Sequence, residues 1–195
     1  HPTGVSNGAA GDDDADPTLA SSRSYVGLSP GTYSVRQHAV AGYGLTNLAC
    51  SSGTTDTAHG TVTVALQPGD QVTCSFGSRL TSLTIVQDTV PNAAQDFTFT
   101  GCAGPGGAAG CASFLLDDDA DPTLPSSTTF TGLVAGTQYS VAQAAVPGYG
   151  LVGLTCTNGL ADLADRRATI VVSAGDQVIC TFSDRVTSIR IVQDT

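Results

Sequence analysis

The chain of 195 residues has no Lys, Glu, Met or Trp, and only 12% of its residues are charged, about half the usual share. Its 17 Asp and seven Arg residues give a net charge of −10, which excludes the basic surface that nucleic-acid binding requires. No apolar run approaches the ~20 residues that span a bilayer. The chain begins at His1 without a leader, so we expect a mature product or a fragment.

Residues suited to catalysis are equally scarce. There is no G-x-S-x-G motif, and the three His residues at positions 1, 38 and 59 have no recurring partners. Neighbouring carboxylates do occur, but in segments that resemble exposed turns rather than the wall of a cleft. We therefore predict that the protein is not an enzyme.

The six Cys residues are spaced so that all of them pair. Two pairs, each 24 residues apart, are related by an offset of 106 residues, and the other two Cys are nine residues apart. The absence of a C-x-x-C motif disfavours zinc. Paired Cys in an acidic chain rich in Gly, Ser and Thr indicate an oxidising, extracellular compartment. We predict three disulfides: Cys50–Cys74, Cys156–Cys180 and Cys102–Cys111.

Two repeats of one module fill nearly the whole chain. The phrase D-D-D-A-D-P-T-L occurs at 12–19 and again at 117–124, and G-D-Q-V-x-C begins at Gly69 and again at Gly175. Within each repeat, short alternating runs are broken by Gly, Pro or Asp-rich turns, which is typical of strands. No stretch has a 3.6-residue period with helix caps. We therefore predict an all-β fold of two tandem antiparallel β-sandwich domains.

The first repeat is shorter at its start than the second. Val90 precedes Asp117 by 27 positions, whereas His1 precedes Asp12 by only 11, so 16 residues are missing. The first repeat also lacks the strand that we expect at 80–88 in the second. An unpaired sheet edge over an open core favours pairing with another chain.

The last eleven residues repeat the strand that the first domain lacks. R-L-T-S-L-T-I-V-Q-D-T at 79–89 recurs as R-V-T-S-I-R-I-V-Q-D-T at 185–195, and residues 1–4 resemble 90–93, which follow the internal phrase. We predict an incomplete sandwich at 1–79, a complete one at 80–185, and a donor strand at 186–195 that completes the first domain of the next unit. The residues expected to mediate polymerisation are Val186, Ile189, Ile191 and Val192.

The motifs D-D-D-A-D-P-T-L, G-T-Q-Y-S-V, V-P-G-Y-G-L and A-G-D-Q-V-I-C-T-F together resemble a known module. They are similar to the prealbumin-like (transthyretin-like) repeats related to the SpaA and Cna B-type domains of bacterial surface proteins. The resemblance implies a secreted β-sandwich that acts as a stalk, spacer or pilin-like unit. The Lys–Asn isopeptide bond of many Cna B-type domains is impossible without Lys, and we expect the disulfides to serve as the lock instead. L-P-S-S-T at 124–128 is not the L-P-x-T-G signal of sortase anchoring.

Asp residues at alternate positions are the one candidate for metal chemistry. Their carboxylates could converge on Ca²⁺ as a cofactor, although Pro122 replaces the expected turn Gly and Thr128 stands where an acid should close the loop. The alternative is a solvated Asp-Pro turn between strands. The two candidate sets are Asp12, Asp14 and Asp16, and Asp117, Asp119 and Asp121.

Together these features predict an extracellular structural protein whose main partner is itself. Head-to-tail β-strand addition would give a homopolymeric filament without a membrane span. A close variant is one period of a longer covalent tandem array. The alternative is a stalk or adhesin segment that binds a protein or glycan. Tyr43 and Tyr149 are its sugar-stacking candidates, although we favour the interpretation that each packs its ring and hydrogen-bonds its hydroxyl at a strand-end turn. Ser and Thr are abundant enough for glycan decoration, but no N-x-S/T sequon occurs.

Overall fold

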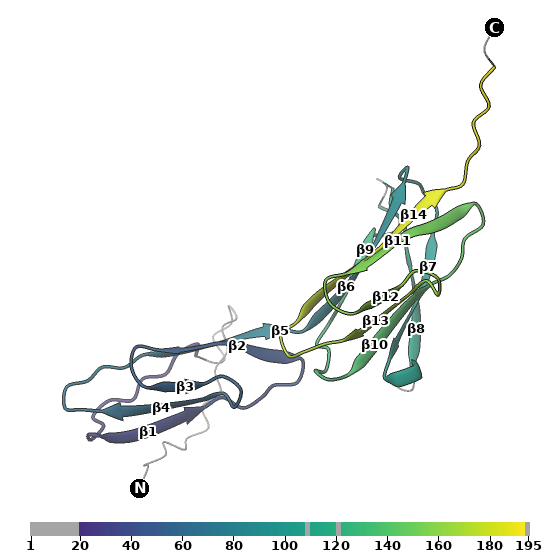
Figure 1. Ribbon diagram of the computed structural model, residues 1–195. Helices are drawn as coiled ribbons and strands as arrows, with labels where there is room; N and C mark the ends of the chain where they lie inside the picture. Colours follow the sequence, from purple (N-terminus) through teal and green to yellow (C-terminus); the bar gives the residue numbers. More distant parts are fainter. Residues whose placement is uncertain (1–19, 108–109, 120–121, 194–195) are drawn as a thin grey trace. The chain divides into compact units, whose positions relative to one another are not determined.

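The computed structural model describes residues 20–107, 110–119 and 122–193 (Figure 1). The chain divides into two compact units: unit 1 comprises residues 1–39 and 45–77, and unit 2 comprises residues 40–44 and 78–195. Apart from one short 3-10 turn, η1 (Pro105–Gly107), every regular element in the described residues is a β-strand. This confirms the predicted all-β fold.

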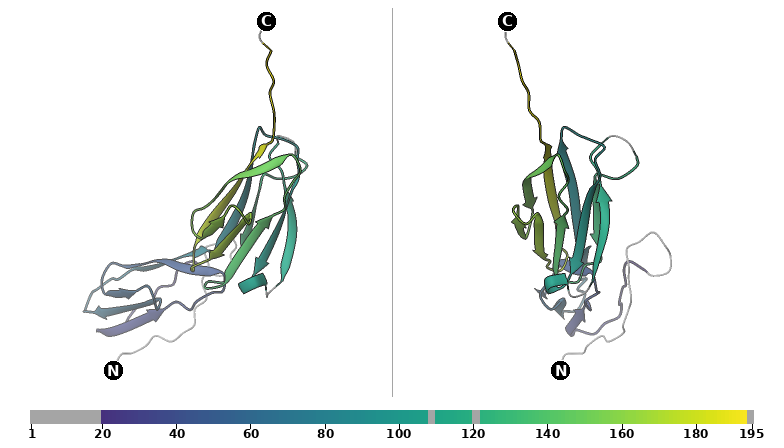
Figure 2. Two further views of the ribbon diagram at one scale, coloured as in Figure 1. Left: turned by 45° about the vertical axis from the view of Figure 1, so that its right-hand side comes forward. Right: turned by 90° about the vertical axis from the view of Figure 1, so that its right-hand side faces the viewer.

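Unit 2 consists of two facing sheets (Figure 2). The five-stranded sheet has the order β12-β13-β10-β7-β8, and the four-stranded sheet has the order β11-β14-β6-β9. The strands are β6 (Ser82–Val90), β7 (Phe97–Ala103), β8 (Cys111–Leu116), β9 (Ser127–Thr131), β10 (Gln138–Gln143), β11 (Tyr149–Cys156), β12 (Leu160–Asp162), β13 (Arg167–Val171) and β14 (Gln177–Val186).

The core of unit 2 follows from strand alternation. In β6, Leu83 and Ile85 are buried whereas Thr84 between them is partly exposed, because successive side chains point to opposite faces. Aromatic rings fill the centre, where Phe99 and Phe182 meet edge to face with ring centroids 5.1 Å apart. Such ring pairs stabilise a core by roughly 0.5–1.5 kcal/mol beyond their burial.

One pairing departs from the predicted antiparallel sandwich. Strands β6 and β14 run parallel, from Ser82 opposite Gln177 to Val90 opposite Arg185, while the other strand pairs with an assigned register in the described residues are antiparallel. These are the first and last strands of unit 2, so the rest of the unit forms the crossover that a parallel pair needs. Alternation shows which face of a strand is buried but not the direction of its neighbour.

Unit 1 is built from fewer strands and has a smaller core. Its three-stranded sheet has the order β1-β4-β3, and its two-stranded sheet pairs β2 with β5. The buried hydrophobic side chains in its described residues are Leu48, Val62 and Val64. The strands are β1 (Gly31–Arg36), β2 (Tyr43–Cys50), β3 (Thr54–Asp56), β4 (Thr61–Leu66) and β5 (Cys74–Leu80).

Candidate functional site

Strand β6 lies inside the four-stranded sheet of unit 2. It pairs with β14 on one side and with β9 on the other. Leu83 faces the core with 2% of its surface exposed, and Ile85 is completely buried. This strand therefore joins β14 to β9 within the sheet and contributes buried side chains to the centre of the sandwich.

A buried polar network ties the end of β6 to the rest of unit 2. The Nε2 of Gln143 donates a hydrogen bond of 2.8 Å to Oε1 of Gln87 and one of 2.6 Å to Oδ2 of Asp184. The Nε2 of Gln87 donates to the same carboxylate oxygen at 3.1 Å. Arg166 forms an ion pair of 3.2 Å with Asp184 and also donates to Gln143. Buried polar groups are tolerated when they satisfy one another in this way.

The backbone at Arg166 marks a difference between the units. Arg166 has a φ of 50°, which is uncommon for a residue with a side chain, whereas its counterpart Gly60 has a φ of 63°. The ion pair with Asp184 accounts for an arginine at this turn in unit 2. Unit 1 has Ser78 at the position of Asp184, so it keeps only Gln37 as the counterpart of Gln143.

Unit 1 lacks a counterpart of β6 in its described residues. With the offset of 106, strands β1 to β5 correspond to β10 to β14. Strand β14 has β11 and β6 as neighbours, but within the described residues β5 pairs with β2 only. Val178 and Phe182 of β14 are buried, whereas Val72 and Phe76 at the same positions in unit 1 are partly exposed.

A second edge of unit 1 is open as well. Strand β10 lies between β13 and β7, while β1 pairs with β4 only among the described residues. Consequently Val35 in β1 is 45% exposed, but Val141 at the same position in β10 is 2% exposed. The C-terminal segment repeats β6 and not β7, so it matches the first of these two openings.

The C-terminal segment, residues 187–193, leaves the end of β14 as an extended chain outside any strand (Figures 1 and 2). The exposed fractions are 87% for Ile189, 86% for Ile191 and 70% for Val192. Val186 differs from these three predicted polymerisation residues, because it is the last residue of β14 and pairs with Tyr149. The predicted strand is thus not formed here, since a strand needs a neighbour for its backbone hydrogen bonds.

Three disulfides cross adjacent strands. Cys156 lies directly opposite Cys180 in the β11–β14 pair, and Cys102 lies opposite Cys111 in β7–β8. Cys50–Cys74 joins the end of β2 to the start of β5 in the same way. These are the pairs expected from the spacing of the Cys residues.

The structure gives a partial view of the Asp clusters. Asp12, Asp14, Asp16 and Asp121 lie outside the described residues. Asp117 is buried and Asp119 is partly exposed. The neighbouring Asp118, which sequence reasoning did not single out, accepts a hydrogen bond of 2.7 Å from the backbone N–H of Thr89. Over the described part of the chain, no group of three or more His, Cys, Asp or Glu residues is placed to hold a metal ion.

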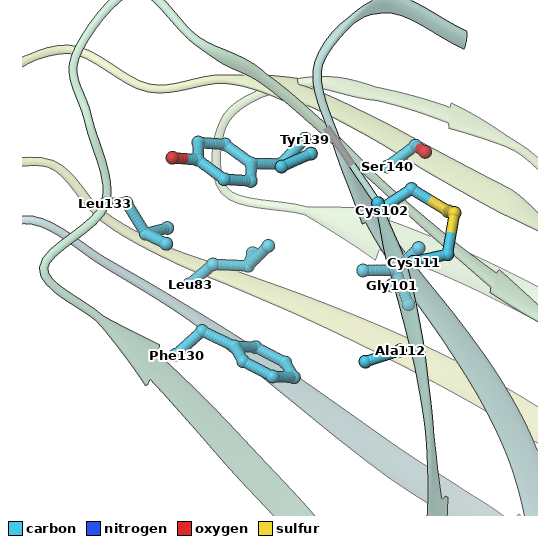
Figure 3. A pocket seen from close by; sticks show the side chains of 12 residues that line it. Leu83, Gly101, Cys102, Cys111, Ala112, Phe130, Leu133, Tyr139 and Ser140 are labelled. Atoms are coloured by element: carbon cyan, nitrogen blue, oxygen red, sulfur yellow. A yellow bond between two sulfur atoms is a disulfide. The ribbon is translucent and has the colours of Figure 1, made fainter. Parts of the chain in front are cut away.

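A cavity of about 420 Å³ opens between the two sheets of unit 2 (Figure 3). Leu83 and Phe130 line it from one sheet, and Tyr139 and Gly101 line it from the other. The lining is mainly apolar. The hydroxyl of Tyr139 accepts a hydrogen bond of 3.0 Å from the backbone N–H of Val134.

Solved structures similar to this chain include a major pilin and a bacterial adhesin. The major pilin from Streptococcus pyogenes has 17% identity and a TM-score of 0.44, over 81% of this chain and 71% of that one. A bacterial adhesin from Mobiluncus mulieris with disulfide, isopeptide and ester cross-links has 12% identity and a TM-score of 0.39, over 67% of this chain. The present chain spans 45% of the length of that adhesin. No curated protein matches the chain.

Both repeats match descriptions of one domain family. Residues 83–186 and residues 3–76 each match a SpaA-type prealbumin-like fold domain. None of the described residues belongs to a helix long and apolar enough to cross a membrane. Because both repeats match, the chain belongs to the family of SpaA-type prealbumin-like fold domains, and it carries two of them in tandem.

Proposed function

We propose that this protein is a structural subunit of an extracellular filament, in which the C-terminal segment of one copy adds as a strand to unit 1 of the next. One observation carries the proposal. Unit 1 has no counterpart of β6 in its described residues, and residues 185–195 repeat the sequence of that strand. The two phrases differ only at Val186, Ile189 and Arg190.

The proposed parts are the incomplete sandwich 1–79, the complete sandwich 80–185 and the donor strand 186–195. Val186 ends β14, so the donated residues proper begin after it. Ile189 and Ile191 stand at the positions of Leu83 and Ile85, which are buried in unit 2. Burial of each Ile side chain stabilises the contact by about 1.5–3 kcal/mol.

Chain direction favours donation to a second copy. Ser82, where the chain enters β6, lies opposite Gln177 at one end of the sheet, and Val186 lies nine residues farther along β14. Nine residues of strand span about 30 Å. The donor segment therefore leaves unit 2 at the end opposite to the one where β6 begins. Contacts between different surfaces of identical subunits give open filaments, or rings where the rotation between subunits closes.

The family supports a structural role at the cell surface. Major pilins and surface adhesins are among the solved structures similar to this chain. Three disulfides persist in an oxidising compartment, which supports an extracellular location. We expect no catalytic activity, and glycan decoration of Ser or Thr is compatible with the proposed role.

Electron microscopy of the native secreted material tests this proposal. Long fibres that dissociate to a 19.5 kDa band on a non-reducing denaturing gel would support strand donation between separate subunits. Fibres that give only a very large band would indicate the covalent tandem array. Deletion of residues 187–195 should leave disulfide-bonded monomers, and normal fibres from this variant would contradict strand donation.

The second candidate function is ligand binding by a stalk or adhesin segment. The apolar cavity beside Phe130 and Tyr139 favours it, because ligand sites are concave and mostly apolar. The variant that lacks 187–195 can be tested for binding to a glycan array or to an apolar fluorescent probe. Binding that is lost on Phe130→Asp would support this function. Compact particles in place of fibres would make it the preferred one.

A further inference from the structure

Within the described residues, strand β9 pairs with β6 alone. It is the edge strand of the four-stranded sheet, and its register runs from Ser82 opposite Thr131 to Val86 opposite Ser127. Phe130 faces inward opposite Leu83 and packs against the core of unit 2. On the outer face, the hydroxyls of Thr84 and Thr129 form a hydrogen bond of 2.9 Å. Strand β9 therefore depends on β6 for its sheet contacts.

Unit 1 contains the counterpart of β9 in sequence but not as a strand. S-S-R-S-Y-V-G-L at 21–28 corresponds to S-S-T-T-F-T-G-L at 126–133, so residues 22–26 correspond to β9. Among the described residues, no strand precedes Gly31. Tyr25 is 39% exposed and Val26 is 90% exposed. The two segments differ in their neighbours. Strand β9 pairs with β6, whereas no strand of the described residues pairs with residues 22–26.

We infer that residues 22–26 are the second wall of the acceptor groove, and that they become a β-strand when the C-terminal segment of a second copy inserts between them and β5. The inference rests on the proposed function, because it needs the donated strand. The completed sheet would have the order β2, β5, donor, 22–26, which matches β11-β14-β6-β9 of unit 2.

The register of unit 2 specifies the contacts of the inserted strand. Since Leu83 lies opposite both Val178 and Phe130, Ile189 would lie between Val72 and Tyr25. This places an aliphatic side chain between a valine and an aromatic ring on the apolar face. Tyr25 is available for this contact, since its side chain is partly exposed. The Cζ atom of Arg23 lies 5.5 Å from the centroid of the Tyr25 ring.

The next residue of the donor faces outward. Arg190 corresponds to Thr84, so it would lie opposite Ser24, the counterpart of Thr129. Directly opposite residues of antiparallel strands have Cα atoms about 4.5–5.5 Å apart, which is within the range of a disulfide. A residue two positions away in the partner strand lies about 7–8 Å or more away and does not bridge without distortion.

A pair of Cys substitutions on the full chain tests the register. In a chain that carries Ser24→Cys and Arg190→Cys, oxidised filaments should give a ladder of covalent multimers on a non-reducing gel. The reducing gel should show one band. The matched control is Ser22→Cys with Arg190→Cys, which places the cysteines two positions out of register and should give no ladder. Each single substitution provides a second control.

Amide hydrogen exchange, measured without any Cys substitution, provides an independent test. The amides of 22–26 should be protected at least tenfold more in filaments than in monomers that lack 187–195. Filaments without protection at 22–26 and without a ladder from the Ser24 pair would overturn this inference while leaving strand donation intact. Failure of the unmodified protein to form filaments would overturn the proposed function itself.

Discussion

Gln143 and Gln87 are joined by a 2.8 Å hydrogen bond inside unit 2, where their exposed fractions are 3% and 1%. Both share the carboxylate of Asp184, which is completely buried and has Arg166 as its counter-ion. The bond connects β6, which has no counterpart among the described residues of unit 1, to β10 in the opposite sheet. The donor segment carries Gln193 at the position of Gln87, and unit 1 carries Gln37 at the position of Gln143.

Removal of Gln143 should destabilise unit 2. The substitution Gln143→Ala leaves Oε1 of Gln87 without its donor and removes one of the three groups that donate to the buried carboxylate of Asp184. Such a loss costs about 1–3 kcal/mol. Chemical denaturation followed by circular dichroism measures the change. Gln177→Ala, at an exposed position of β14, is the matched control and should stay within about 0.5 kcal/mol. Equal effects of the two substitutions would contradict a role for the network.

Charge on the apolar face of the donor segment should block assembly without unfolding the subunit. Ile189 and Ile191 are almost fully exposed in the single chain, so Ile189→Asp with Ile191→Asp should leave the melting temperature unchanged. The loss of two buried Ile contacts, at least ~3 kcal/mol, should raise the critical concentration for filaments more than about 100-fold.

The control for this double substitution is Arg190→Thr, which restores the residue found in β6. Because position 190 faces outward in the inferred register, this variant should assemble as the wild type does. Sedimentation of filaments over a concentration series measures both variants. Assembly of the Asp variant at the wild-type concentration would show that the apolar face is not inserted.

The disulfides should contribute unequally to stability. Loss of Cys156–Cys180, which closes a separation of 24 residues, should cost about 3 kcal/mol by the chain-entropy estimate. Loss of Cys102–Cys111, with a separation of nine residues, should cost less, about 2.5 kcal/mol. Paired Cys→Ala substitutions and denaturant titration test this order. A reversed order would show that strand packing around each bridge outweighs loop entropy.

The pKa of the Asp56 carboxyl group should depend on the side chain of His59. The ring Nδ1 of His59 lies 2.7 Å from Oδ2 of Asp56, and its backbone N–H donates to Oδ1, which together hold the pKa of Asp56 below its usual value of 3.8. A lowered pKa means that this stabilisation exists above about pH 3.8 and disappears as the pH falls through the folded-state pKa. His59→Ala should raise the pKa in a carboxyl NMR titration, and His38→Ala should not.

Calcium distinguishes the two interpretations of the Asp-rich loops. Asp117 is buried, and Asp118 accepts a hydrogen bond from the backbone of Thr89, as expected of a structural turn. We therefore expect the melting temperature to be the same in millimolar Ca²⁺ and in EGTA. A rise of several degrees in Ca²⁺, abolished by Asp121→Asn, would instead support a bound ion.

Much of the fold could be predicted from local patterns. Alternation shows which side chains of a strand face the core, because successive residues point to opposite faces, and Leu83 and Ile85 follow this rule. The repeat offset identifies equivalent Cys residues, so the bridge Cys156–Cys180 has its partner in Cys50–Cys74. Internal similarity likewise identifies residues 185–195 as a second occurrence of β6.

The buried network could not be predicted in this way. Gln143 and Gln177 have the same side chain in similar alternating runs, yet one is buried and the other exposed. Which of them enters the core depends on residues that are distant in sequence, such as Gln87 and Asp184. Local propensity carries no information on such partners.

The sequence by itself determined the inward face of each alternating run, the repeat, the Cys pairs and the family of this protein, because these depend on neighbouring residues or on internal comparison. Only the tertiary structure decided which strands lie side by side. Ser82 and Gln177 are 95 residues apart in sequence but form one parallel pair, and that pairing identifies β5 as an open edge in the described part of unit 1. The missing neighbour also explains why residues 22–26 do not form a strand although their sequence corresponds to β9. A strand exists only beside another strand that satisfies its backbone hydrogen bonds.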